Sequence, residues 1–94
     1  MSIRSLEKNN YQIVTTVAVS NFLEVLHKKD KGFHDEIYKT FNKIRKDPSR
    51  GKPLSNNHKN YLSERVRGFR IIYRVVGSEI RIHDIGNRDD VYSI

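Results

Sequence analysis

The sequence predicts an α+β domain with an N-terminal strand, a helical hairpin and then a three-stranded antiparallel meander, with both helices on one face of the sheet. Three observations predict it. Apolar residues recur at helical spacing in the middle of the chain, three strand-like runs follow residue 60, and two-residue loops containing glycine separate those runs. The chain has 94 residues, 36% of them hydrophobic, so it has room for one domain with a single modest core.

The N-terminal third contains one predicted strand and one predicted helix. Residues 1–10 are polar and are expected to form a flexible arm, so the domain spans residues 11–94. Tyr11–Val19 is rich in β-branched residues, which predicts a strand. Ser20 offers an N-cap for a helix over Asn21–Lys29, and Gly32 is expected to end the helical pattern. The inward-facing residues of this helix are expected to be Phe22, Leu23 and Leu26.

A second helix is predicted over Phe33–Lys46. Its apolar residues recur at spacings of four, four and three, which places them on one helical face; they are Phe33, Ile37, Phe41 and Ile44. Asp47-Pro48 ends the helix because the residue before a proline is disfavoured in the helical region. Arg50–Asn60 is polar and rich in turn-forming residues, which predicts a connecting loop.

The C-terminal third reads as a meander of three strands, Tyr61–Val66, Phe69–Val76 and Glu79–Ile85. The loops between them are Arg67-Gly68 and Gly77-Ser78, and a two-residue loop is the shortest hairpin connection. The second loop suits a turn with glycine first. In the first loop, one turn type would require a positive φ at the arginine.

The two short loops set the pairing, and directly paired residues share a sheet face. One face, expected to lie against the helices, then holds Leu62, Val66, Phe69, Ile71, Tyr73, Val75, Ile80 and Ile82. Glu64 and Asp84 fall on this side too, so strand ends or a bulge must intervene there. The opposite face, called the open face below, collects Tyr61, Ser63, Arg65, Arg70, Ile72, Arg74, Arg81 and His83.

The predicted open face has four arginines and no carboxylate, and it pairs Ile72 with His83. Arginine opposite arginine destabilises a sheet. A merely solvated face remains an alternative, but such a face usually mixes both signs of charge, and lysine would serve it as well. Planar guanidinium groups match phosphate oxygens in two-point contacts, so the pattern favours anion binding.

The overall charge narrows the classes of partner. Eighteen Lys and Arg against eleven Asp and Glu give a formal net charge of +7, which attracts polyanions such as nucleic acid or an acidic protein. No apolar run approaches the roughly 20 residues that cross a bilayer, and no secretory signal pattern is present, so a cytoplasmic location and no membrane partner are expected. The chain has no cysteine, and His27, His34 and His58 lack metal-ligand spacing with one another, so no metal or cofactor is expected.

From Gly51 to Tyr92 the sequence resembles the RelE/ParE toxin family. The resemblance is carried by GKPL at Gly51–Leu54, RVRGFRIIYRV at Arg65–Val75 and IGNRDDVY at Ile85–Tyr92. The preceding strand and helical hairpin follow the family's order, so the resemblance covers nearly all of Tyr11–Tyr92.

The resemblance implies a RelE-like toxin domain and a microbial toxin–antitoxin pair. RelE-like members are ribosome-dependent ribonucleases that cut mRNA in the decoding site, without a metal. The implied partners are therefore mRNA on the ribosome and a cognate antitoxin, which we expect to be acidic and helical. Two alternatives stay open: a ParE-like inhibitor of DNA gyrase that has no catalysis of its own, and an inactive member of the family.

The resemblance also assigns candidate residues. Arg70, Arg88 and Tyr92 match family positions that imply catalysis, with Tyr92 transferring a proton, stacking on a base or simply packing on the sheet. The candidate RNA-binding residues are Arg65, Arg74, Arg81, His83, Lys52 and Lys59. His83 suits proton transfer by its reference pKa, but the reading as a structural or surface residue is favoured over a catalytic role. The departures from the family pattern are Tyr61, Ser63 and Asn87, which stand where basic residues often occur.

Overall fold

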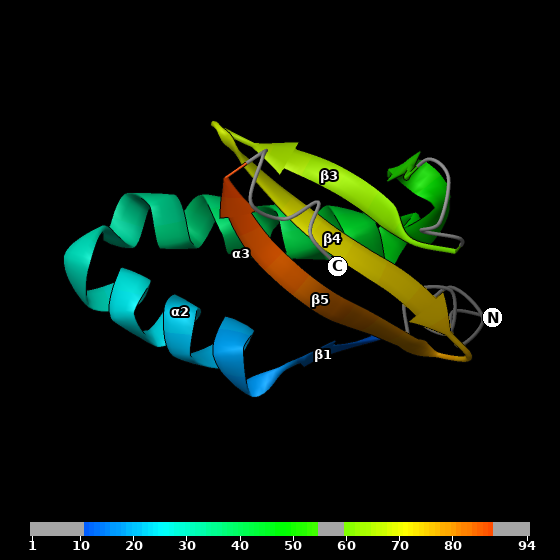
Figure 1. Cartoon of the computed structure of the whole chain (residues 1–94), viewed down its shortest axis with the longest axis horizontal. Helices are drawn as coiled ribbons and strands as arrows, with labels where there is room; N and C mark the ends of the chain where they lie inside the picture. The colour runs from blue at the N-terminus through cyan, green and yellow to red at the C-terminus, as the bar shows by residue number, and fades with distance from the viewer. Residues whose placement is uncertain (1–10, 55–59, 88–94) are drawn as a thin grey trace, which may run out of the picture.

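The computed structural model describes residues 11–54 and 60–87, and it confirms the α+β class. Five strands form one sheet in the order β1-β5-β4-β3-β2, and both helices pack on one of its faces (Figure 1). The elements are β1 (Gln12–Thr15), α2 (Val17–Lys29), α3 (Lys31–Lys46), the 3-10 helix η1 (Pro48–Arg50), β2 (Lys52–Pro53), β3 (Leu62–Val66), β4 (Phe69–Val76) and β5 (Glu79–Asn87). None of the described helices is both long and apolar enough to cross a membrane.

The N-terminal strand is shorter than predicted, and the helix after it begins earlier. The β-branched run divides at Thr16, whose Oγ1 accepts a hydrogen bond from the backbone N–H of Val19 at 3.1 Å. Thr16, rather than Ser20, is therefore the N-cap of α2. Val17 and Val19 were predicted in the strand, but the helix buries Val19 and leaves Val17 76% exposed. The short β1 lies parallel to β5 at one edge of the sheet.

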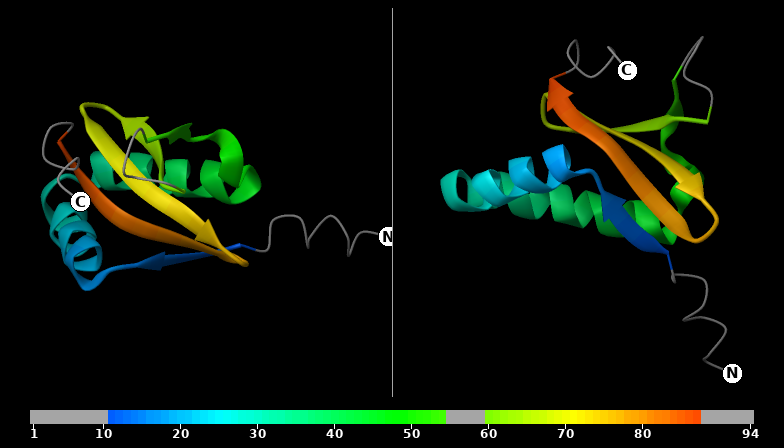
Figure 2. Two further views of the ribbon diagram at one scale, coloured as in Figure 1. Left: turned by 45° about the vertical axis from the view of Figure 1, so that its right-hand side comes forward. Right: turned by 60° about the horizontal axis from the view of Figure 1, so that its bottom comes forward.

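The break between the helices lies at Asp30, not at Gly32. The side chain of Asp30 accepts a hydrogen bond from the N–H of Phe33 at 3.1 Å, while its own N–H bonds to the carbonyl of Leu26 at 2.8 Å. One residue thus closes α2 and caps α3, so Gly32 lies in the first turn of α3. The two views in Figure 2 show the resulting helical hairpin on one side of the sheet.

The core forms between α3 and the central strands, as predicted. The four apolar residues of the predicted helical face are all buried; they are Phe33, Ile37, Phe41 and Ile44. They share one cluster with the β4 residues Ile71 and Tyr73, and Phe69 packs against it, its ring 5.0 Å from that of Phe33. Val75 was expected in the core, but it is 37% exposed because it lies two residues from the turn at Gly77.

Both meander turns form where the sequence places them. Gly77 has a φ of 61°. Arg67 also has a positive φ, 55°, which is costly for a residue with a side chain. Its guanidinium donates to both carboxylate oxygens of Glu36 at 3.0 and 2.9 Å and lies 4.7 Å from the centre of the Phe33 ring. These hydrogen bonds hold the pKa of Glu36 below its usual value, so α3 and the β3–β4 turn support each other.

The segment predicted as a loop from Arg50 contains ordered structure, namely the end of η1 and the edge strand β2. The buried hydroxyl of Tyr73 donates to the carbonyl of Pro48 at 2.9 Å and accepts from the N–H of Gly51 at 3.1 Å. A Cβ at residue 51 would lie only 2.5 Å from that hydroxyl, so glycine is needed there. Burial raises the pKa of Tyr73. This anchor places Lys52 opposite Ser63.

The predicted register holds across β3 and β4 and fails once in β5. Tyr73 pairs with Ile82, but Ile72 pairs with Asp84, so His83 is an extra residue in a β-bulge. The bulge anticipated near Asp84 is confirmed, while the predicted pairing of Ile72 with His83 is wrong. Because the bulge reverses the alternation, Asp84 leaves the helix-covered face and Ile85 enters the core.

Glu64, the other carboxylate expected on the helix-covered side, does lie there. It pairs with Ile71 in the sheet register and accepts a hydrogen bond from Nε of Arg50 at 2.7 Å. The ion pair lies at the β3 side of the core. The positive charge of Arg50 therefore stabilises the Glu64 carboxylate on the helix-covered face, and no bulge in β3 is required to move it.

Candidate functional site

The open face carries its cations in rows that run across the strands. In the first row Arg65 pairs with Arg70, which in turn pairs with Gly86. Arg70 therefore lies on the face away from the helices, as predicted. Its Nη1 donates a hydrogen bond to Oγ of Ser63 at 3.2 Å, which orients the guanidinium. Gly86 presents no side chain beside Arg70.

The second row consists of Lys52, Ser63, Ile72 and Asp84. Ile72 is fully buried although it faces away from the helical layer, and Ser63 is only 4% exposed. The middle of this face is therefore packed rather than fully solvated. Asp84 is half-buried, and its Oδ1 accepts a hydrogen bond from the N–H of Ile85 at 2.8 Å.

The third row pairs Arg74 with Arg81, and Arg81 with Val14 of β1. Nε of Arg81 donates to a carboxylate oxygen of Glu79 at 2.9 Å. The prediction that the open face has no carboxylate is therefore wrong. Glu79 lies two residues from Arg81 on the same strand face, and the bulge brings Asp84 to this face as well.

Two cavities are lined in part by residues of the open face. The first, of about 290 Å³, brings together the residues of the first row and their neighbours; its lining is Arg50, Lys52, Ser63, Glu64, Arg65 and Arg70. Three predicted residues, Arg65, Arg70 and Lys52, thus meet at one place. The Arg50–Glu64 ion pair forms part of its wall. We call this the arginine cavity.

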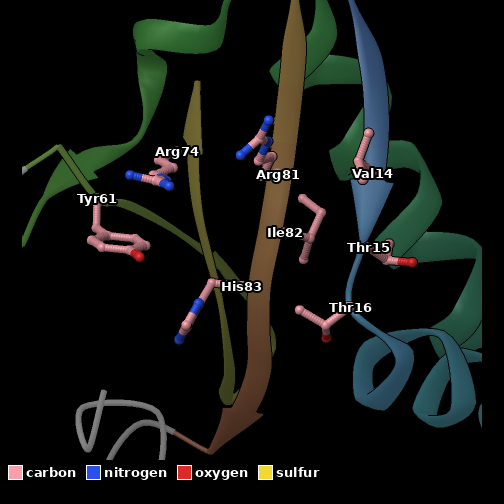
Figure 3. A pocket seen from close by; sticks show the side chains of 8 residues that line it. All are labelled: Val14, Thr15, Thr16, Tyr61, Arg74, Arg81, Ile82 and His83. Carbon is pink, nitrogen blue, oxygen red and sulfur yellow. The ribbon is translucent and has the colours of Figure 1, made fainter. Parts of the chain in front are cut away.

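The second cavity, of about 170 Å³, lies over β5 near the third row (Figure 3). Tyr61 and Arg74 are on one side of β5, and residues of β1 and the N-cap Thr16 are on the other. The full lining is Val14, Thr15, Thr16, Tyr61, Arg74, Arg81, Ile82 and His83. We call it the tyrosine cavity. It brings together the predicted Arg74, Arg81 and His83.

Three predicted residues, Arg88, Tyr92 and Lys59, lie outside the residues that the structure describes. Their roles remain predictions. Sequence reasoning placed Tyr61 on the open face and noted it as a departure from the family pattern, but gave it no binding role. It placed Asp84 on the wrong face. The signal for Asp84 was present, because a carboxylate at a core position of a strand indicates a bulge.

The arrangement can bind anions and planar rings. Guanidinium groups supply paired donors for phosphate oxygens, and Tyr61 and His83 supply ring faces and edges. Within residues 11–54 and 60–87, no group of three or more His, Asp or Glu side chains has the geometry to hold a metal ion.

Comparison with known families finds a family model that matches most of the chain. Residues 13–92 match the model described as the ParE toxin of the type II toxin–antitoxin system parDE. No curated protein matches the chain.

Comparison with solved structures finds the same fold in several toxins. A YoeB/ParE toxin from Agrobacterium tumefaciens superimposes with a TM-score of 0.74 at 21% identity, covering 82% of this chain and 98% of that one. The toxin–antitoxin complex RelBE2 from Mycobacterium tuberculosis gives 0.68 at 23% identity, covering 84% and 99%. A mutant of the E. coli toxin RelE, in complex with a peptide of the antitoxin RelBc, gives 0.66 at 16% identity, covering 89% and 92%.

Proposed function

This chain belongs to the RelE/ParE family of toxins from type II toxin–antitoxin systems, and from that premise we propose that it is a metal-independent endoribonuclease that cleaves mRNA on the ribosome. The substrate is a strand of RNA laid along the open face. The residues that act on it are those of the arginine cavity, together with Arg88 and Tyr92.

The observation that carries the proposal is the pairing of arginine with arginine in two rows, Arg65 with Arg70 and Arg74 with Arg81. Like charges placed directly opposite each other weaken a sheet. The cost disappears when a polyanion lies between them. Two rows on one face suit a ligand with several phosphates better than one with a single negative group.

The chemistry follows from the residues of the arginine cavity. Metal-free cleavage of RNA needs the 2′-hydroxyl to attack the adjacent phosphorus in line with the departing 5′-oxygen. Negative charge then builds on the phosphate oxygens, where Arg70, oriented by Ser63, donates hydrogen bonds. Arg65 and Lys52 hold the backbone on either side. This role assigns Arg70 to stabilisation of the transition state.

Proton transfer needs separate groups. The attacking hydroxyl loses a proton and the leaving oxygen gains one. Tyr92 is our candidate for one of these transfers, and Arg88 adds a second positive group for the phosphate. Among the described residues of the open face, His83, Asp84 and Glu79 carry imidazole or carboxyl groups, which can exchange protons.

The partner that silences the toxin is, we infer, an acidic antitoxin that covers the open face. Solved structures with this fold include toxins in complex with an antitoxin or antitoxin peptide. Binding of an acidic segment by exposed arginines is screened by salt, so the complex should weaken as ionic strength rises.

Expression of the chain from a tightly controlled promoter tests the nuclease proposal. Growth should stop, and transcripts should be cut only while they are being translated. Arg70→Ala should abolish both effects, while Lys39→Ala, which removes one positive charge from the exposed side of α3, should abolish neither. Growth arrest with intact transcripts would refute the nuclease proposal.

A gyrase inhibitor without catalysis is the second candidate, because the matching family model is that of ParE toxins. The two carboxylates on the open face, Glu79 and Asp84, also make it less uniformly basic than predicted. Purified toxin added to gyrase and relaxed plasmid distinguishes the two. Inhibited supercoiling together with intact mRNA would support this candidate.

A further inference from the structure

We propose that the tyrosine cavity binds one nucleotide of single-stranded RNA, with the base on the Tyr61 ring and the phosphate at Arg74. This inference rests on the proposed function in one respect, that RNA lies on the open face. It adds a subsite that binds the RNA at a distance from the arginine cavity, so that RNA recognition and cleavage take place at separate sites.

The aromatic part of the subsite is rigidly placed. The Tyr61 ring contacts that of His83 edge to face, with centroids 5.3 Å apart and planes at 67°. The backbone of Tyr61 is held as well, because its carbonyl accepts a hydrogen bond from the N–H of Leu54 at 3.0 Å. The preceding Asn60 takes a φ of 70°, which turns the chain into β3. A ring fixed in this way loses little conformational freedom when a base stacks on it.

His83, which contacts the ring, is the extra residue of the β5 bulge. An extra residue at this position re-aims side chains and interrupts the ladder, and such bulges are frequent beside functional sites. Figure 3 shows His83 and Tyr61 on the same side of β5, with Ile82 and Thr16 across from them. Val14, which is 38% exposed, adds apolar contact area, so the cavity offers a surface for a planar, partly apolar ligand.

The charged part of the subsite centres on Arg74. Its guanidinium carbon lies 5.6 Å from the centre of the Tyr61 ring, so a cation stands next to the stacking surface. Within the part of the chain that the structure describes, Arg74 makes no ion pair, whereas Arg81 is held by Glu79 at 2.9 Å. Arg74 is therefore the stronger anion-binding group, and the pairing of a ring with a cation matches a base linked to its phosphate.

The two cavities cannot hold the same nucleotide. Arg70 and Arg74 lie four residues apart on β4, and a strand rises about 3.3 Å per residue, so they are roughly 13 Å apart along it. Successive nucleotides of a stacked strand are only about 3.4 Å apart. The fully buried Ile72 lies between the two arginines. A strand cleaved in the arginine cavity therefore places a different nucleotide in the tyrosine cavity.

Binding of a labelled, uncleavable RNA tests the subsite without relying on catalysis. A short 2′-O-methyl oligonucleotide lacks the attacking hydroxyl, so fluorescence anisotropy reports binding alone. Tyr61→Leu should weaken binding about 5- to 150-fold, the range expected for one base–aromatic stack, and Tyr61→Phe should restore it. Tyr38→Leu, which removes an exposed tyrosine from α3, is the matched control and should leave binding unchanged.

A second pair of variants tests the charge. Arg74→Gln should weaken binding and lower its dependence on salt, since one phosphate contact is lost, and it should do so more than Lys39→Gln, which removes the same charge from α3. Thermal unfolding of each variant shows that the fold is intact. Equal affinities for Tyr61→Leu and Tyr38→Leu would overturn the subsite, whatever the cleavage assays show.

The remaining outcomes separate this inference from the nuclease proposal. RNA binding that depends on Tyr61 and Arg74, in a protein that cuts no mRNA, would support the subsite while refuting the nuclease. A 5′-mononucleotide that binds as tightly as the oligonucleotide would overturn the assignment to an RNA strand, because a strand engages further cations of the open face.

Discussion

Removal of the Tyr73 hydroxyl is the change for which the structure best defines the loss of folding free energy. That hydroxyl is buried and makes two hydrogen bonds, to the carbonyl of Pro48 at 2.9 Å and from the N–H of Gly51 at 3.1 Å. Tyr73→Phe keeps the ring in the core and deletes both. Since one hydrogen bond contributes about 0.5–1.5 kcal/mol, the free energy of unfolding should fall by about 1–3 kcal/mol. For a domain of this size each kcal/mol lowers Tm by about 4–8 °C.

The same hydroxyl predicts a dependence on pH. Burial raises the pKa of Tyr73 above its value of about 10 in the unfolded chain, so the folded state holds this proton more tightly. The stabilisation is fully present below pH 10 and is lost as pH rises through the raised pKa. Phenylalanine does not ionise, so the difference in stability between the parent and Tyr73→Phe should narrow above about pH 10.

Thermal and urea unfolding of the purified proteins, followed by circular dichroism from pH 7 to pH 11, measure both effects. Tyr38→Phe is the control, because it removes an exposed hydroxyl from α3 and should change Tm little. The variant should also lose RNA cleavage, since the anchor positions Lys52 and Arg50 at the arginine cavity. A parent and a Tyr73→Phe variant with equal Tm at pH 7 would refute the role given to this hydroxyl.

Three further substitutions test other parts of the structure. Gly51→Ala should destabilise the fold strongly in thermal unfolding, because its Cβ would lie 2.5 Å from the buried tyrosine hydroxyl, whereas Gly68→Ala meets nothing within 4 Å and should be tolerated; equal Tm values would contradict the close approach. Thr16→Ala should lower the free energy of unfolding by about 1 kcal/mol in urea, as the loss of an N-cap does, and Ser20→Ala should lower it clearly less. A larger loss for Ser20→Ala would show that Ser20 is the N-cap, as the sequence suggested. Arg70→Ala should slow ribosome-dependent cleavage roughly 100- to 1,000-fold, as loss of one donor to a developing oxyanion does, so an unchanged rate would remove Arg70 from the site.

Parts of the candidate site could be predicted because a two-residue loop fixes which residues of its two flanking strands pair with each other. Arg65 opposite Arg70, and Arg74 opposite Arg81, follow from two-residue turns alone, and the structure has both pairs. The position of Asp84 could not be predicted in the same way. A bulge adds one residue to one strand, and every later side chain then changes face, so a local irregularity reverses the assignment beyond it.

The sequence by itself determined the class of fold, the buried face of α3 and the arginine rows, because these depend on periodicity and on turns that span a few residues. Only the tertiary structure decided where the β-branched N-terminal run becomes a helix, since Thr16 caps that helix and Val19 is buried against the rest of the core. Only the tertiary structure also showed that the N–H of Gly51 binds the hydroxyl of Tyr73, and that the Tyr61 ring contacts His83 next to Arg74. These contacts join residues far apart in the chain, and no local pattern of residues records the distance between them.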